Sequence, residues 1–229
     1  MPTKSGPSGG SQPELFPLGE STGNVELFPA VWSAAEFLCR PELSERTTGL
    51  DRLVELKAAR FSPLVAYLLA TRLTDTEMEF RVRVVRALGD LFFPDEEGSP
   101  TPQDVRRVVS GYLSQMRTRK VYALLQVVIE EPGLTEHVAR LLDVCPYAGN
   151  HLADIVADRT IKQDIREQAV LAIGRVGFLD VLPALERLET RLESRVNGQR
   201  AMPFAPPSTE DEAELLPAVQ RTIAALRAP

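Results

Sequence analysis

Two segments of this 229-residue chain share one pattern, and a repeated helical pattern constrains the fold more than any other feature of the sequence. In residues 80–91 and again in 165–176, an apolar residue and an arginine precede small or branched apolar residues and then a glycine. The arginines are Arg81 and Arg166, and the glycines are Gly89 and Gly174. Intervals of three and four between the apolar residues predict equivalent helices, and a glycine near the helix end permits close packing. The sequence therefore predicts a stacked array of similar helical units.

Helical spacing continues through most of the chain. The predicted helices cover residues 29–39, 45–59, 63–73, 77–92, 102–116, 119–131, 134–143, 148–158, 161–176, 179–195 and 209–227. Ser62-Pro63 and Thr101-Pro102 have the cap-then-proline pattern that begins a helix, and Thr76 is a further expected cap. Because the links are short, neighbouring helices must lie antiparallel. We expect an all-α fold, an α-α right-handed superhelix of antiparallel helix pairs, in one domain over residues 28–227.

The repeated helix resembles the HEAT-like repeat, in the version first described in phycobilisome lyases. The match is good over residues 161–190, where Leu182-Pro183-Ala184-Leu185 begins the next helix, and fair over 62–92. This resemblance implies a HEAT-like solenoid, and it implies little about function, because the repeat serves many unrelated roles. It also implies that Arg81 and Arg166 bond acidic residues that end the preceding helices, at Asp75 and Asp158.

The number of helices between the two copies departs from a regular alternation. Both copies should be the second helix of a pair, yet four predicted helices separate them. Either one of the four is an insertion or two of them form one broken helix. The expected insertion is 102–116, because it follows the acidic loop at residues 93–98.

The N-terminal segment has a different composition. Residues 1–27 are rich in Ser, Gly and Pro, which predicts a disordered tail, since such a segment buries too little apolar surface to offset its ordering entropy. The tetrapeptide Glu14-Leu15-Phe16-Pro17 recurs as Glu26-Leu27-Phe28-Pro29. One interpretation is chance, with Pro29 beginning a helix. The other is a short docking motif in which Leu15 and Phe16 enter a groove.

The composition offers little for catalysis. Two cysteines, Cys39 and Cys145, exclude a disulfide scaffold, and the two histidines, His137 and His151, leave little for imidazole chemistry or a metal cage. No P-loop, GxSxG or GxGxxG motif is present, so we assign no catalytic, cofactor-binding or metal-binding residue, and expect a non-enzyme. No apolar segment is long enough to span a membrane and the N-terminus lacks a secretory signal, so we expect a cytoplasmic protein. The basic residues are mostly arginine, as in GC-rich genomes, and we expect a bacterial source.

The leading hypothesis is a protein-binding scaffold, since stacked helix pairs expose long ridged surfaces. The candidate surface contains exposed positions on the second helices and a basic window at 104–120: Arg83, Arg86, Glu167, Arg175, Arg106, Arg107, Arg117, Arg119 and Lys120. The resemblance offers one alternative, a phycobilisome-lyase-like protein that attaches a bilin. A third possibility is a nucleic-acid-binding module that uses residues 104–120 with Tyr112 and Tyr122. The net charge of −6 weighs against nucleic acid as the partner.

Overall fold

The computed structural model describes residues 28–200 and 210–228, and these form twelve α-helices and no strand. The predicted tail over residues 1–27, with Leu15 and Phe16, lies outside the described residues. The helices are α1 (Pro29–Leu38), α2 (Leu43–Glu55), α3 (Ala58–Phe61), α4 (Pro63–Thr71), α5 (Met78–Gly89), α6 (Gln103–Leu113), α7 (Thr118–Glu130), α8 (Thr135–Asp143), α9 (Ala148–Ala157), α10 (Gln163–Val176), α11 (Leu182–Arg200) and α12 (Glu210–Arg227). The all-α prediction is confirmed. Within the described ranges, no helix is both long and apolar enough to cross a bilayer.

One predicted helix and two of the three predicted caps differ from the structure. The helix expected over 45–59 is split into α2 and α3, because Lys57 between them takes a left-handed conformation with φ of 49°. The cap at Ser62 is confirmed, since its hydroxyl accepts the Val65 amide at 3.1 Å. The caps expected at Thr76 and Thr101 are wrong. Glu77 and Pro102 hold the cap positions there, and neither makes a side-chain capping bond.

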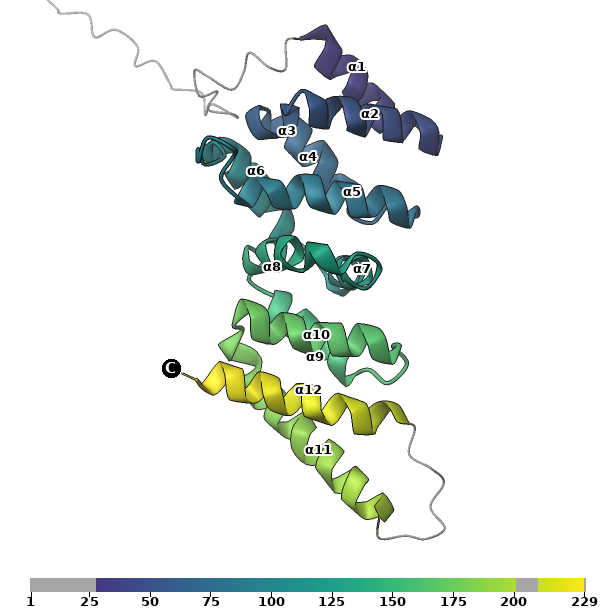
Figure 1. Ribbon diagram of the computed structural model, residues 1–229, viewed down its shortest axis with the longest axis vertical. Helices are drawn as coiled ribbons and strands as arrows, with labels where there is room; N and C mark the ends of the chain where they lie inside the picture. The colour runs from purple at the N-terminus through teal and green to yellow at the C-terminus, as the bar shows by residue number, and fades with distance from the viewer. Residues whose placement is uncertain (1–27, 201–209, 229) are drawn as a thin grey trace, which may run out of the picture.

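The helices pack as consecutive pairs along an elongated stack (Figure 1). The pairs in contact are α1 with α2, α4 with α5, α7 with α8, α9 with α10, and α11 with α12. One helix of each pair also contacts its counterpart in the next pair, giving a row of α2, α5, α8, α10 and α12. Helix α6 stands outside these pairs and packs against α4 and α3. The contacts of α6 therefore agree with the expectation that segment 102–116 is the insertion.

The two repeated helices are equivalent members of the row. Val84, Val85 and Leu88 of α5 are buried, and one continuous apolar core extends from Val31 in α1 to Leu226 in α12. A β-carbon on Gly89 would stand 2.5 Å from the β-carbon of His137 in α8. A glycine near the end of the repeated helix thus marks the place where the next helix of the row approaches, as the sequence pattern predicts.

The arginines of the two copies have different partners. Asp75 forms its ion pair with Arg46 of α2 at 3.1 Å, so the pair of Arg81 with Asp75 that the resemblance implies is wrong. Arg81 instead lies 3.2 Å from the sulfur of Met78, and burial lowers the pKa of its guanidinium, which the nearby Asp75 charge partly offsets. Arg166 donates from Nε to the Val156 carbonyl at 3.0 Å.

Candidate binding groove

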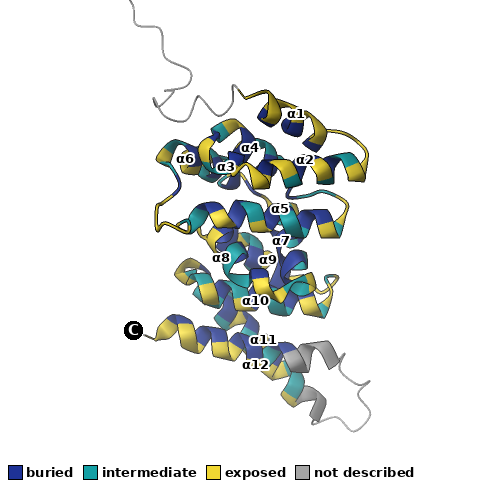
Figure 2. Ribbon diagram, turned by 45° about the horizontal axis from the view of Figure 1, so that its top comes forward, coloured by how far each residue is buried: buried dark blue, intermediate teal, exposed yellow. Residues whose placement is uncertain are grey.

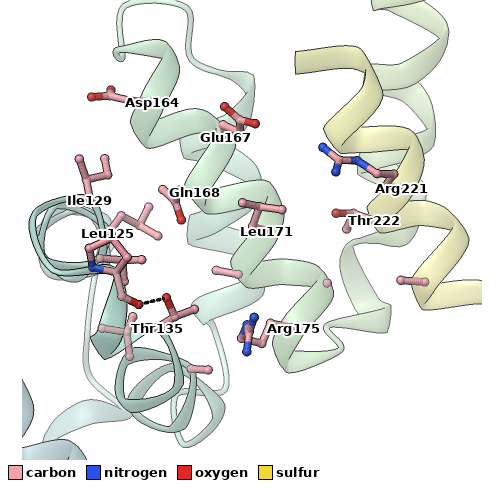
Figure 3. A pocket seen from close by; sticks show the side chains of 17 residues that line it. Leu125, Ile129, Thr135, Asp164, Glu167, Gln168, Leu171, Arg175, Arg221 and Thr222 are labelled. Atoms are coloured by element: carbon pink, nitrogen blue, oxygen red, sulfur yellow. Dashed lines mark hydrogen bonds between the residues drawn. The ribbon is translucent and has the colours of Figure 1, made fainter. Parts of the chain in front are cut away.

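A groove of about 670 Å³ crosses the row of helices on both sides of α10 (Figure 3). Helices α7 and α8 border it on one side and α12 borders it on the other. Its apolar lining includes Leu125, Ile129, Val138, Ala139, Leu171, Ala172 and Ala225. A volume of this size falls within the range of pockets that hold ligands or side chains of a partner.

The sequence of α10 explains why one helix supplies both core and groove. Ile165, Ala169 and Ile173 recur at intervals of four and are buried against the rest of the protein. Glu167, Leu171 and Arg175 recur at the same interval, so they share the opposite face and line the groove. Leu171 is 42% exposed on a face that is otherwise mostly polar. An apolar side chain in that position is available to a partner.

Small residues hold the groove walls close together. Gly174 of α10 allows Thr222 of α12 to approach, and the Thr222 hydroxyl donates to the Val170 carbonyl at 3.2 Å. Ala172 and Ala225 also line the groove with short side chains, which leaves space around Leu171. The groove is thus formed where two helices of the row approach one another over small residues.

Charges are distributed unevenly along the groove. Asp164 and Glu167 lie near the start of α10, and Arg175 lies near its end (Figure 3). Glu136 of α8 pairs with Arg175 at 3.5 Å and with Arg140 at 3.2 Å, so the charge of Arg175 is already compensated. Glu167 forms no ion pair with any described residue. The α10 wall of the groove is therefore acidic near the beginning of the helix, and Arg221 of α12 faces it from the other wall (Figure 3).

The predicted surface residues of the row fall into two places. Glu167 and Arg175 line the groove. Arg83 and Arg86 of α5 lie outside it and link neighbouring elements. Arg83 pairs with Asp51 of α2, and Arg86 lies 4.0 Å from Glu131, which immediately follows α7. Arg83 thus links α5 to the preceding helix of the row, and Arg86 links α5 to the segment between α7 and α8.

None of the basic-window residues lines the groove. Arg106 and Arg107 are exposed on α6, Arg117 and Arg119 are exposed at the start of α7, and none of the four forms an ion pair within the described ranges. Lys120 differs, because its ammonium donates to the Tyr112 hydroxyl at 2.9 Å and lies 4.0 Å from the centroid of that ring. The window is thus a separate surface that carries four uncompensated arginines.

The histidines and cysteines occupy separate places. His137 lies 3.0 Å from Asp90, and His151 lies 3.1 Å from the hydroxyl of Thr118. Cys39 is exposed and Cys145 is buried, and both are free thiols. Among the residues that the structure describes, no three His, Cys, Asp or Glu side chains are grouped so that they could hold a metal ion.

Leu171 is the groove residue that sequence reasoning missed. Alignment of the two repeat copies places Leu171 opposite Arg86, an exposed arginine, so the apolar substitution was visible in the sequence. Arg221 and Thr222 gave no such signal, because their place beside α10 depends on how α12 packs. No protein-family model matches the chain, and the comparisons with curated proteins and with solved structures give no match either.

Proposed function

We propose that this protein is a non-enzymatic binding scaffold, a HEAT-like right-handed superhelix whose groove receives an amphipathic helix from a partner protein. The observation that carries the proposal is Leu171, which is half-exposed in the middle of a groove with apolar walls. A partner that covers Leu171 gains the free energy of burying apolar surface on both sides.

The shape and lining of the groove favour a helix as the occupant. Helices α8 and α12 border the groove, and an inserted helix would pack against them as the helices of the row pack against one another. Its apolar residues at intervals of three and four would contact Ile129, which is partly buried, and Leu171, which is exposed. The occupant is therefore a helix with one apolar stripe.

The charges favour one orientation of that helix. Asp164 and Glu167 make the α10 wall acidic at one end of the groove, with Arg221 on the facing wall, so the partner should carry lysine or arginine on the side that meets α10. Basic residues stabilise the last turn of a helix, because the backbone at its C-terminus has a partial negative charge. The backbone at the N-terminus of α10 has a partial positive charge, which would attract the C-terminus of the partner helix. The partner helix should accordingly lie antiparallel to α10, with its basic C-terminal turn over Asp164 and Glu167.

A displayed library of amphipathic helical peptides, selected on the full chain, tests this function. The selected peptides should share an apolar stripe with a basic end, and Leu171→Asp should weaken their binding by tenfold or more. Leu179→Asp is the matched control, because Leu179 is 63% exposed and lies outside the groove. Selection of no peptide, or equal binding of the selected peptides to both variants, would contradict the proposal.

Natural binding can be tested with the same pair of positions. A photo-crosslinking residue at position 171, but not at 179, should join the protein to a specific partner in cells of the source organism, and the wild-type chain but not Leu171→Asp should co-purify that partner. The proposal places this interaction in the cytoplasm of a bacterium, where the free thiols of Cys39 and Cys145 would stay reduced.

Two alternative functions have support of their own. Bilin attachment follows from the repeat resemblance, and the groove volume suits a small molecule. A covalent adduct formed on incubation with a bilin and a candidate apoprotein would favour it. Nucleic-acid binding is supported by the four uncompensated arginines of α6 and α7. A gel shift at low salt that Arg106→Glu/Arg107→Glu abolishes would favour that function.

A further inference from the structure

The first helix of the stack has an apolar face that no other described element covers. Helix α1 packs on α2 through Val31, Ala34 and Leu38. Its solvent side (Figure 2) exposes Trp32 by 52% and Phe37 by 38%, and Phe28 just before the helix is exposed by 59%. Ser33 and Glu36 lie between Trp32 and Phe37 on this side, and Glu36 is the one charged residue of the helix. A terminal helix of a stacked array ordinarily presents a polar outer face to water. The face of α1 thus has the character of a contact surface.

The two ends of the stack differ in this respect. Twelve large apolar side chains are exposed in the described residues, and nine of them fall within residues 28–67. None falls in the described parts of α11 and α12, which form the opposite end. The exposed apolar surface is therefore concentrated toward the N-terminal end and is not a general property of the terminal helices.

We propose that the chain's own Leu15-Phe16 segment binds along this face of α1. The residues between Phe16 and Phe28 number eleven, and such a tether spans up to about 36 Å when extended. Helix α1 has ten residues and is about 15 Å long, so the segment reaches every part of the face. The tether also gives the segment a local concentration of about millimolar order, which a free partner must exceed.

The composition of the tail identifies these two residues as the anchors. Between Met1 and Leu15 the sequence contains no large apolar residue, so Leu15 and Phe16 form the first apolar pair of the chain. They occur in a tetrapeptide, Glu14-Leu15-Phe16-Pro17, that is repeated at the start of α1 as Glu26-Leu27-Phe28-Pro29. Burying a leucine and a phenylalanine against Trp32 and Phe37 would cover the apolar surface on both sides.

Charge complementarity sets the direction of the segment. Arg40, just beyond the C-terminal end of α1, is exposed and forms no ion pair in the part of the chain that the structure describes. Glu14 immediately precedes Leu15, so a segment antiparallel to α1 places this carboxylate beside Arg40. The same direction brings the following residues back toward Phe28, where α1 begins.

Trp32 is the only tryptophan and reports directly on this contact. We expect its fluorescence in the full chain to be blue-shifted and weakly quenched by acrylamide, with no dependence on protein concentration. Leu15→Ser/Phe16→Ser should shift the emission to the red and raise the quenching constant severalfold. Leu18→Ser/Val25→Ser is the matched control, with the same number of apolar residues removed from the tail, and should leave both readings unchanged.

Every other result counts against the proposal. Equal quenching in the wild type and in Leu15→Ser/Phe16→Ser would mean that the segment does not cover Trp32. Shielding that increases with protein concentration would assign the face to a second copy of the chain. Circular dichroism of the variants should be unchanged, because the substitutions lie outside the described helices. The groove lies toward the other end of the stack, so loss of peptide binding there would not affect this result.

Discussion

Thr222 of α12 lies against Gly174 of α10 so closely that a β-carbon on this glycine would stand 3.2 Å from the threonine methyl carbon. The Thr222 hydroxyl donates to the Val170 carbonyl one turn earlier in α10. The pair therefore sets the distance between two walls of the groove.

The first prediction concerns this contact. Gly174→Ala should lower the free energy of unfolding by about 0–2 kcal/mol, because overpacking of the interface costs about 1–3 kcal/mol and the gain of alanine over glycine inside a helix, about 0.5–1 kcal/mol, offsets part of it. In a Thr222→Ser background the cost should be smaller, since the methyl carbon that meets the new β-carbon is gone. Denaturant unfolding of the two single variants and the double variant measures the coupling. Strictly additive losses would mean that the two residues do not meet.

The second prediction concerns the attachment of α1 to α2. A β-carbon on Gly49 would stand 2.5 Å from the backbone nitrogen of Leu38 and 2.6 Å from the carbonyl oxygen of Ala34. Because backbone atoms cannot rotate away, Gly49→Ala should displace α1 and destabilise the fold by about 1–3 kcal/mol. Gly111→Ala is the control, since nothing lies within 4 Å of the new atom. In the interior of α6, that change should stabilise the protein by about 0.5–1 kcal/mol. Thermal unfolding of both variants provides the test, and a neutral Gly49→Ala would contradict the packing.

The third prediction compares a buried ion pair with an exposed one. Arg46 pairs with Asp75, and both side chains are almost fully buried. Arg46→Met leaves the Asp75 carboxylate without its partner and should cost about 3–5 kcal/mol. Arg83→Met breaks the half-exposed pair with Asp51 and should cost less than about 1 kcal/mol. Urea unfolding separates the two cases, and similar losses would show that burial does not distinguish them.

The fourth prediction concerns pH. The Thr160 amide, at 2.9 Å, and the Thr160 hydroxyl, at 2.8 Å, donate to the Asp158 carboxylate and hold its pKa below the ordinary value. A lowered folded pKa means that ionised Asp158 stabilises the fold above its unfolded pKa. This contribution is lost as the pH falls below about 4 and passes through the folded pKa.

Thr160→Val removes the hydroxyl bond and keeps the amide bond. The pKa of Asp158 should therefore rise part of the way toward its ordinary value, measured by carboxyl NMR titration. Thr190→Val is the matched control, because that hydroxyl bonds the Glu186 carbonyl in α11, far along the chain from Asp158. A pKa of Asp158 that is the same in the wild type and in Thr160→Val would contradict the assigned cause.

The sequence predicts the helices better than it predicts their contacts. Apolar spacing places α5 and α10 correctly, because burial along one face is a property of each helix alone. The break at Lys57 has no comparable signal in the sequence. A lysine rarely takes the left-handed conformation, so the conformation of Lys57 depends on the packing around it. The partner of Asp75 was missed for a similar reason. Arg46 is distant in sequence, and only the docking of α2 beside α5 brings its guanidinium to that carboxylate.

The groove was predictable only in part. The repeat pattern predicts that Glu167 and Arg175 lie on the exposed side of the repeated helix, and both line the groove. Comparison of the two copies would also have revealed Leu171, because its equivalent is Arg86. The contribution of α12 depends on the close approach of Thr222 to Gly174, which is a tertiary contact. The spacing of apolar residues predicts which side of each helix faces solvent. Only the packing of the helices determines which of these sides come together to form the groove.

The position of α6 has a consequence for how this molecule could change over time. Helix α6 packs beside α4 and α3 and does not lie between α5 and α8, so α5 and α8 contact each other directly. The arginines on α6 can then be gained, lost or exchanged without altering the spacing of the row or the walls of the groove. One chain therefore carries two surfaces that selection can modify separately: a groove fixed by the packing of the row, and a basic face on an added helix.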